Sequence, residues 1–190
     1  MALAPILKKL ASSHPRLVVE THTNDGFVDI MAEGFDAGIR LGEAVQQDMV
    51  AVRLTPPFKA ILVASPEYLA ARGEPATLAD LSTHNCVGFR LLGSGSLYEW
   101  GVTDGERQVA VKTTGTAVIS DATFARELAL EGIGIAYIFE PPVRADLSER
   151  LRWVPPQASL QEDGLFVYFP RRAALAPKLR AFIGACRQPD

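Results

Sequence analysis

The sequence contains few of the residues on which metal, redox and membrane functions depend. Its 190 residues include two cysteines and three histidines, and none of these stand at the spacing of a zinc site. We therefore predict no bound metal and no cofactor, and we interpret Cys86 and Cys186 as reduced thiols of a cytoplasmic protein. No run is long and apolar enough to span a membrane. Pro5, Lys8 and Lys9 interrupt the first ten residues, so this segment does not resemble the uninterrupted apolar core of a secretory signal.

Motifs of nucleophilic and nucleotide chemistry are also missing. The glycine and serine residues at 93–96 do not match the nucleophile elbow of hydrolases. The Gly-Ile-Gly at 132–134 ends a predicted helix and opens a strand, which is the reverse of a dinucleotide-binding loop. Cys86 with His84 as its base is an alternative, but Cys86 lies in an apolar run and we interpret it as a core thiol. We therefore predict no catalytic residue and no enzyme activity.

Basic residues are not in excess. Lys and Arg number 19 against 22 Asp and Glu, so the formal net charge is −3. DNA binding depends on a basic patch, so we do not expect this chain by itself to bind nucleic acid. With 48% hydrophobic and 22% charged residues, the chain is globular and long enough for one domain or two small ones.

Two short apolar runs, at residues 37–41 and 60–64, organise the chain and are predicted to be buried strands. Arg40 interrupts the first run, and a buried guanidinium requires an anionic partner. Ser65 follows the second run as the predicted N-cap of a helix over residues 67–72, whose free N–H groups could bind an anion. The alternatives are a surface ion pair for Arg40 and an ordinary helix cap for Ser65.

Helix and strand patterns alternate along the rest of the chain. The early order of helix, strand, helix and strand favours a parallel sheet. It lacks an opening strand, so we expect the chain to be a fragment of a longer protein. The predicted strands are residues 17–22, 37–41, 60–64, 86–90, 98–102, 108–113, 118–119, 133–139, 153–154 and 165–169. Residues 155–163 are predicted to be a linker.

This element order predicts two α/β subdomains. The cuts fall after the two long apolar strands and give residues 1–64 with 165–190 as the first subdomain and residues 65–164 as the second. Ligands of open α/β sheets bind outside the carboxyl ends of the strands, and pockets favour domain junctions. We therefore expect a ligand site in the gap between the two subdomains.

Several motifs, in order, resemble the effector-binding domain of LysR-type transcriptional regulators. They are DAGIRLG at residues 36–42, VASPEYLAARGEP at 63–75, GIGIA at 132–136 and LFVYFPRR at 165–172. The resemblance covers nearly the whole chain. It implies an α/β fold of periplasmic-binding-protein type II architecture, with two Rossmann-like subdomains and a ligand cleft. It also implies a sensor of a small organic effector, against the alternatives of a solute-binding protein or an enzyme on the same fold.

The resemblance further implies which positions contact the effector. By matching position these are Thr23, Asn24, Arg40, Leu41, Gly42, Ser65, Phe89, Arg90, Ser120, Asp121 and Phe139. The arginines and the helix that follows Ser65 favour an anion. Phe89 and Phe139 could equally be ordinary core residues.

The family resemblance also implies partners. Its members bind DNA through an N-terminal winged helix-turn-helix, which these 190 residues do not include. They form homodimers or homotetramers. In this chain the implied contact joins the helix at residues 3–12 and the strand at 17–22 to the helix at 122–131 of the partner.

Overall fold

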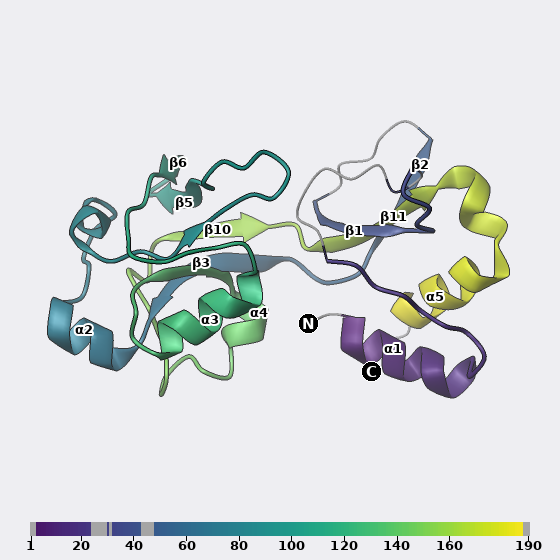
Figure 1. Ribbon diagram of the computed structural model, residues 1–190, viewed down its shortest axis with the longest axis horizontal. Helices are drawn as coiled ribbons and strands as arrows, with labels where there is room; N and C mark the ends of the chain where they lie inside the picture. The colour runs from purple at the N-terminus through teal and green to yellow at the C-terminus, as the bar shows by residue number, and fades with distance from the viewer. Residues whose placement is uncertain (1–2, 24–29, 31, 43–47, 188–190) are drawn as a thin grey trace. The chain divides into compact units, whose positions relative to one another are not determined.

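The computed structural model describes residues 3–23, 30, 32–42 and 48–187 and divides them into two compact units (Figure 1). Unit 1 comprises Met1–Pro57 and Glu162–Asp190, and unit 2 comprises Phe58–Gln161. The helices are α1 (Leu3–Ser13), α2 (Pro66–Arg72), η1 (Ala79–Thr83), α3 (Ala122–Leu130), α4 (Glu140–Val143), η2 (Arg171–Leu175) and α5 (Pro177–Arg187). The strands are β1 (Gly38–Leu41), β2 (Met49–Arg53), β3 (Phe58–Ala64), β4 (Gly88–Phe89), β5 (Trp100–Asp104), β6 (Arg107–Val111), β7 (Val118–Ile119), β8 (Ala136–Phe139), β9 (Arg152–Trp153), β10 (Ser159–Glu162) and β11 (Leu165–Pro170).

The core of unit 1 is a three-stranded sheet in the order β1-β11-β2. The apolar run of β11 occupies the centre, where Val167 is fully buried opposite Ile39 on one side and Val52 on the other. The strands predicted at residues 37–41 and 165–169 are therefore confirmed. The expected parallel pairing is wrong for the first of them, since β1 pairs antiparallel with β11. The parallel expectation applies to strands that follow one another along the chain, whereas the neighbour of β1 is β11, from the far end of the chain.

Residues 17–22 do not form the predicted strand. No described strand pairs with them, and Val18 is 89% exposed. Alternating apolar residues fit a strand only when a neighbouring strand takes up the backbone hydrogen bonds.

Two amphipathic helices, α1 and α5, pack in unit 1. Ile6 and Leu10 are buried on α1 and pack with Ala185 of α5. On α5, Leu179 packs against Val167 of the sheet. Each helix thus buries a single stripe, which is the arrangement expected of an amphipathic helix on a small core.

Unit 2 is built on β3, in which residues 60–64 are fully buried. Its neighbours are β10 on one side and β8 on the other, and β9 also pairs with it. Because side chains alternate along a strand, Leu62 packs with Trp100 of β5, while Ile61 packs with Ala129 of α3. The β5–β6 hairpin therefore covers one face of the sheet, and α3 and α4 cover the other (Figure 1).

The linker predicted at residues 155–163 is wrong, because it contains strand β10, which pairs with β3. Its sequence, Ser-Leu-Gln-Glu, lacks the β-branched and aromatic residues that mark strands. Leu160 nevertheless faces Gly101 of the hairpin, where an added Cβ would lie 3.2 Å from the leucine side chain. Tertiary packing therefore holds this strand in place, and its composition alone does not predict it.

Candidate functional site

Three strands of unit 2 run in the same direction and end at one edge. β4 pairs in parallel with β7, Phe89 lying opposite Ile119, and Cys86 bridges in parallel to Ile135, just before β8. Their carboxyl ends lie at Phe89, Ile119 and Phe139, so the next residues in the first two strands, Arg90 and Ser120, are neighbours. The Arg90 backbone N–H indeed donates to the Ile119 carbonyl at 2.7 Å. We call this the β4-β7-β8 edge.

Apolar and cationic side chains lie along the β4-β7-β8 edge. Phe139 is half-buried and stands edge-on to Phe58 with ring centroids 5.2 Å apart. Phe89 is half-buried against the α3 side of the core. The side chain of Arg90 is exposed, and its Nη1 donates to the Gly95 carbonyl at 2.7 Å, which positions the guanidinium.

Asp121 serves as the N-cap of α3. Its carboxylate accepts from the Thr123 N–H at 2.7 Å, and this hydrogen bond lowers the pKa of Asp121 below its ordinary value. Asp121 itself supplies the negative charge at this helix terminus, and the Ser120 hydroxyl beside it is exposed.

In unit 1 the end of β1 holds Arg40. This half-buried arginine donates from Nε to the Tyr168 hydroxyl at 3.0 Å, and its guanidinium lies 5.5 Å from the centre of the Tyr168 ring. The ring lies across Gly38, where a side chain would collide with it. Leu41 pairs with Leu165. Gly42 takes a φ of +70°, which favours glycine, and donates to the Gly164 carbonyl at 3.1 Å.

Ser65 is not brought to the β4-β7-β8 edge. It caps α2 as predicted, accepting from the Tyr68 N–H at 3.2 Å, and is 4% exposed. Because β3 runs antiparallel to β8, with Ala60 opposite Phe139, Ser65 emerges at the other end of the sheet, about 16 Å away. Of the remaining predicted contacts, Thr23 is exposed and Asn24 lies outside the described residues.

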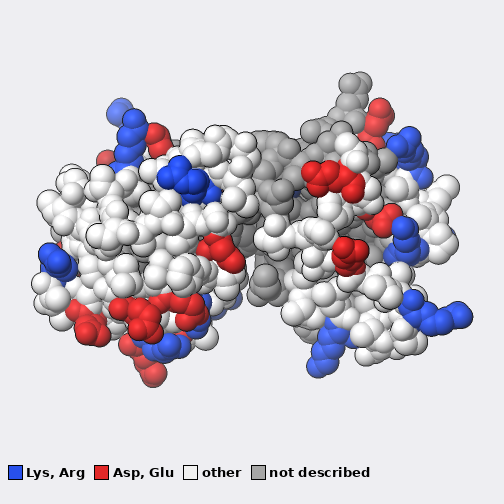
Figure 2. Space-filling model, viewed as in Figure 1, with Lys and Arg blue, Asp and Glu red and all other residues white. Residues whose placement is uncertain are grey.

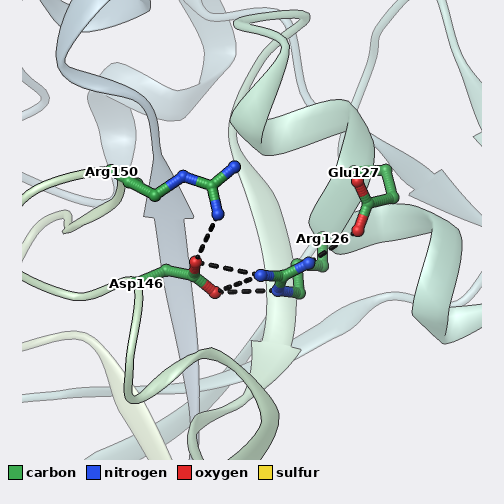
Figure 3. A network of polar contacts seen from close by, with 4 residues as sticks. All are labelled: Arg126, Glu127, Asp146 and Arg150. Atoms are coloured by element: carbon green, nitrogen blue, oxygen red, sulfur yellow. Dashed lines mark hydrogen bonds and ion pairs between the residues drawn. The ribbon is translucent and has the colours of Figure 1, made fainter.

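Sequence reasoning missed an ionic network that anchors α3 (Figure 3). Asp146, 4% exposed, accepts from Arg126 Nε at 2.8 Å and from its Nη2 at 2.9 Å, and from Arg150 Nη1 at 3.0 Å. Arg126 also reaches Glu127 at 2.6 Å. A two-pronged arginine–carboxylate pair fixes both distance and angle. Arg126 and Asp146 are twenty positions apart in the sequence, so no local sequence pattern indicates this contact.

Groups for other chemistries are not assembled in the described residues. No three of their His, Cys, Asp or Glu side chains lie close enough to hold a metal ion. Burial raises the pKa of both Cys86 and Cys186 to about 11, so both are neutral thiols near neutral pH. On the face drawn in Figure 2, Lys and Arg are dispersed among Asp and Glu, which gather along the lower rim of unit 2.

Comparison with known families identifies the chain. The LysR substrate binding domain family matches residues 1–189. The chain belongs to this family. The LysR-like resemblance of its motifs is thereby confirmed, and its relatives are transcriptional regulators and not enzymes.

Relatives of this LysR domain include full regulators. A transcriptional regulator of Pseudomonas aeruginosa is 35% identical over 186 residues, which cover 97% of this chain and 61% of the relative. The HTH-type regulator YcaN of Escherichia coli is 34% identical over 182 residues, covering 95% of this chain and 59% of the relative. The chain thus spans about 60% of the length of these relatives.

Solved structures confirm the predicted fold class. The regulatory domain of a variant of AphB from Vibrio vulnificus matches 97% of this chain and 89% of its own, with a TM-score of 0.82 and 22% identity. CrgA of Neisseria meningitidis, a LysR-type transcriptional regulator, matches 98% of this chain and 64% of its own, with a TM-score of 0.81 and 25% identity. No helix in the described ranges is long and apolar enough to cross a membrane.

Proposed function

We propose that this LysR domain is the effector sensor of a cytoplasmic transcriptional regulator and that its effector is a small organic anion. The observation that carries the proposal is the β4-β7-β8 edge, where Phe89, Arg90, Ser120 and Phe139 stand at the carboxyl ends of three adjacent strands. Mostly apolar walls with a few placed polar groups are typical of small-ligand sites. We propose Arg90 in unit 2 and Arg40 in unit 1 as the groups that bind the negative charge.

DNA binding belongs, in this proposal, to a helix-turn-helix module of the complete regulator. Two observations support this assignment. The relatives are named as HTH-type regulators and are longer than the matched region, and this chain carries a net charge of −3. Effector binding would then act on the DNA-binding module through the assembled oligomer, by shifting the balance between two of its states.

Substitution of either arginine tests the anion contact. We expect Arg90→Gln and Arg40→Gln each to weaken binding of an acidic effector by about 1.5–3 kcal/mol, the range for a charge-assisted hydrogen bond. Isothermal titration gives the affinities. Arg107→Gln, at an exposed arginine of β6, is the control and should bind as the wild type does. An affinity unchanged in both site variants would show that neither arginine contacts the effector and that their roles are purely structural.

The dimer is the second part of the proposal. We propose a head-to-tail dimer in which α3 of one chain contacts α1 and residues 17–22 of its partner. Phe124 on α3 and Val18 support this arrangement, since their side chains are 52% and 89% exposed. Isolated apolar side chains are common on surfaces, but an aromatic one on an anchored helix is a typical interface residue.

The two cysteines of this chain do not have the properties of peroxide-sensing thiols. A regulatory domain of AphB has been studied after treatment with cumene hydroperoxide, but the likeness shows the fold alone. Reactive thiols are accessible and ionised, whereas Cys86 is 1% exposed and both cysteines have a pKa of about 11. We expect the folded chain to react with a disulfide reagent such as DTNB far more slowly than the same chain unfolded in guanidinium. Equal rates would contradict the buried placement.

A further inference from the structure

A depression of about 650 Å³ lies in unit 2 at the edge where β3 ends, opposite the β4-β7-β8 edge. α2, at the left of Figure 1, forms one wall with Glu67, Tyr68 and Arg72. The segments at residues 82–85 and 114–116 form the others. We call it the His84 depression. Its volume falls within the range of about 300–1,000 Å³ that holds small organic ligands.

Asn85 makes the floor of the His84 depression rigid. Its Nδ2 donates to Thr116 Oγ1 at 3.0 Å and to the Ile133 carbonyl at 2.6 Å, while its Oδ1 accepts from the Thr116 N–H at 2.7 Å. Gly115 and Gly134 pack so closely on the backbone of residues 85–86 that neither position has room for a side chain. The floor is therefore formed before any ligand arrives, which lowers the entropic cost of binding.

The hydrogen bonds of Tyr68 determine which nitrogen of His84 carries the proton. The Tyr68 oxygen accepts from the Asn85 N–H at 2.9 Å, and the same hydroxyl lies 3.1 Å from His84 Nδ1. The hydroxyl proton is best placed toward Nδ1, because the alternative leaves it without an acceptor in a buried setting. Nδ1 is then the acceptor, and Nε2 carries the imidazole proton.

That Nε2–H donor has no partner within the described chain. His84 is 8% exposed and lines the depression. Its Nε2 is not one of the fully buried polar atoms that lack a hydrogen-bond partner. A donor on a nine-tenths buried ring that faces an open depression is satisfied by an acceptor from outside the chain.

The rim of the depression carries one charge of each sign. Arg72 and Glu67 are both exposed on α2 and both line the depression. Arg72 stands one helical turn from Tyr68, on the same row of the helix, so its guanidinium is on the side of the Tyr68–His84 pair. The Thr116 hydroxyl, which accepts from Asn85, has its own proton available to donate.

We propose that the His84 depression is a second binding site, for a small carboxylate, that receives the acid on His84 Nε2–H, Arg72 and the Thr116 hydroxyl. It lies on a different edge of unit 2 from the proposed effector site and shares no residue with it. The Glu67 carboxylate repels the same ligand weakly, so its charge is predicted to work against that of Arg72. The two sites are therefore independent, and either proposal can fail alone.

The His84 imidazole reports on this site directly. Two-dimensional ¹H–¹⁵N spectra of the imidazole rings should show His84 as the Nε2–H tautomer and should shift saturably as sodium acetate is added at constant ionic strength. His84→Phe assigns the signal, and His14 and His22, both exposed, are internal controls. An Nδ1–H tautomer, or shifts with acetate no larger than with chloride, would overturn the proposal.

A matched pair of charge variants sharpens the test. Arg72→Gln should weaken acetate binding about tenfold, the loss of one charge-assisted hydrogen bond, while Glu67→Gln should leave binding equal or tighter. Both side chains are exposed on the same short helix, so both variants should fold. Arg107→Gln is the control for general loss of positive charge. Equal weakening by all three variants, or by none, would contradict the assignment.

Discussion

Asp146→Ala is expected to destabilise the chain by about 3 kcal/mol, the lower end of what breaking a buried ion pair costs. The carboxylate is 5% exposed and neutralises Arg126, whose side chain is 28% exposed, and Arg150, whose side chain is 61% exposed. Without it, α3 keeps a half-buried guanidinium that lacks its two-pronged partner (Figure 3). For a chain of 190 residues, this corresponds to a melting temperature lower by roughly 6–12 °C.

Two variants separate the ionic contribution from general effects of substitution. Asp146→Asn keeps the shape and one acceptor but removes the charge, so it should fall between the wild type and Asp146→Ala. Arg144→Ala breaks the exposed pair between Arg144 and Glu140 and should cost less than about 1 kcal/mol. Thermal and urea unfolding give all three values. A stability of Asp146→Ala within about 1 kcal/mol of the Arg144→Ala value would show that the network does not anchor α3.

Phe124→Glu is expected to separate the proposed dimer. A two-fold axis repeats each contact, so the substitution removes two aromatic side chains per dimer. At about 2 kcal/mol for each buried aromatic anchor, the dissociation constant should rise by about three orders of magnitude. Sedimentation velocity over a range of concentrations measures this change.

Leu175→Glu is the matched control for Phe124→Glu. Leu175 is 81% exposed, on η2, and lies outside the proposed interface. The variant introduces the same charge and should sediment as the wild type does. A wild-type chain that remains monomeric at high micromolar concentration, or a control that dissociates as readily as Phe124→Glu, would contradict the proposed arrangement.

Elements with local signals could be predicted from the sequence. Ser65 is predicted as a helix cap because a short polar side chain stands between a buried strand and a helical segment, and its hydroxyl accepts a backbone N–H. Asp121 accepts a backbone N–H at the start of α3 in the same way. The β5–β6 hairpin follows from alternation around the Asp104-Gly105 turn. These signals extend over a few residues, so the structure they predict does not depend on distant parts of the chain.

Features set by distant contacts could not be predicted in this way. The antiparallel partner of β1 comes from β11, more than a hundred residues later. β10 has a polar sequence and is a strand only because β3 is beside it. The pairing of Tyr68 with His84 and of Arg126 with Asp146 likewise has no periodic pattern. Side-chain chemistry alone does not show which distant groups will meet.

The separation of Ser65 from the β4-β7-β8 edge is the clearest example at the candidate site. The residue types suggested one group of anion-binding features at the ends of neighbouring strands. The strand directions decide otherwise, because β3 runs against β8 and carries Ser65 to the opposite edge. Sequence patterns rarely fix strand direction, and strand direction determines which strand ends share a site.

The sensing of a small organic anion is tested most directly by a thermal-shift screen of matched acid and amide pairs. Each carboxylic acid is compared with its own amide, so that only the charge differs. A ligand that binds the folded state raises the melting temperature in proportion to its concentration over its dissociation constant. We predict that at least one acid stabilises the Arg72→Gln chain, in which the His84 depression is weakened, while its amide does not. Arg40→Gln and Arg90→Gln, each introduced into the Arg72→Gln chain, should lose this stabilisation. Stabilisation by amides or amines alone, or equal stabilisation by acids in the Arg72→Gln chain and in both of its site variants, would contradict the proposed function.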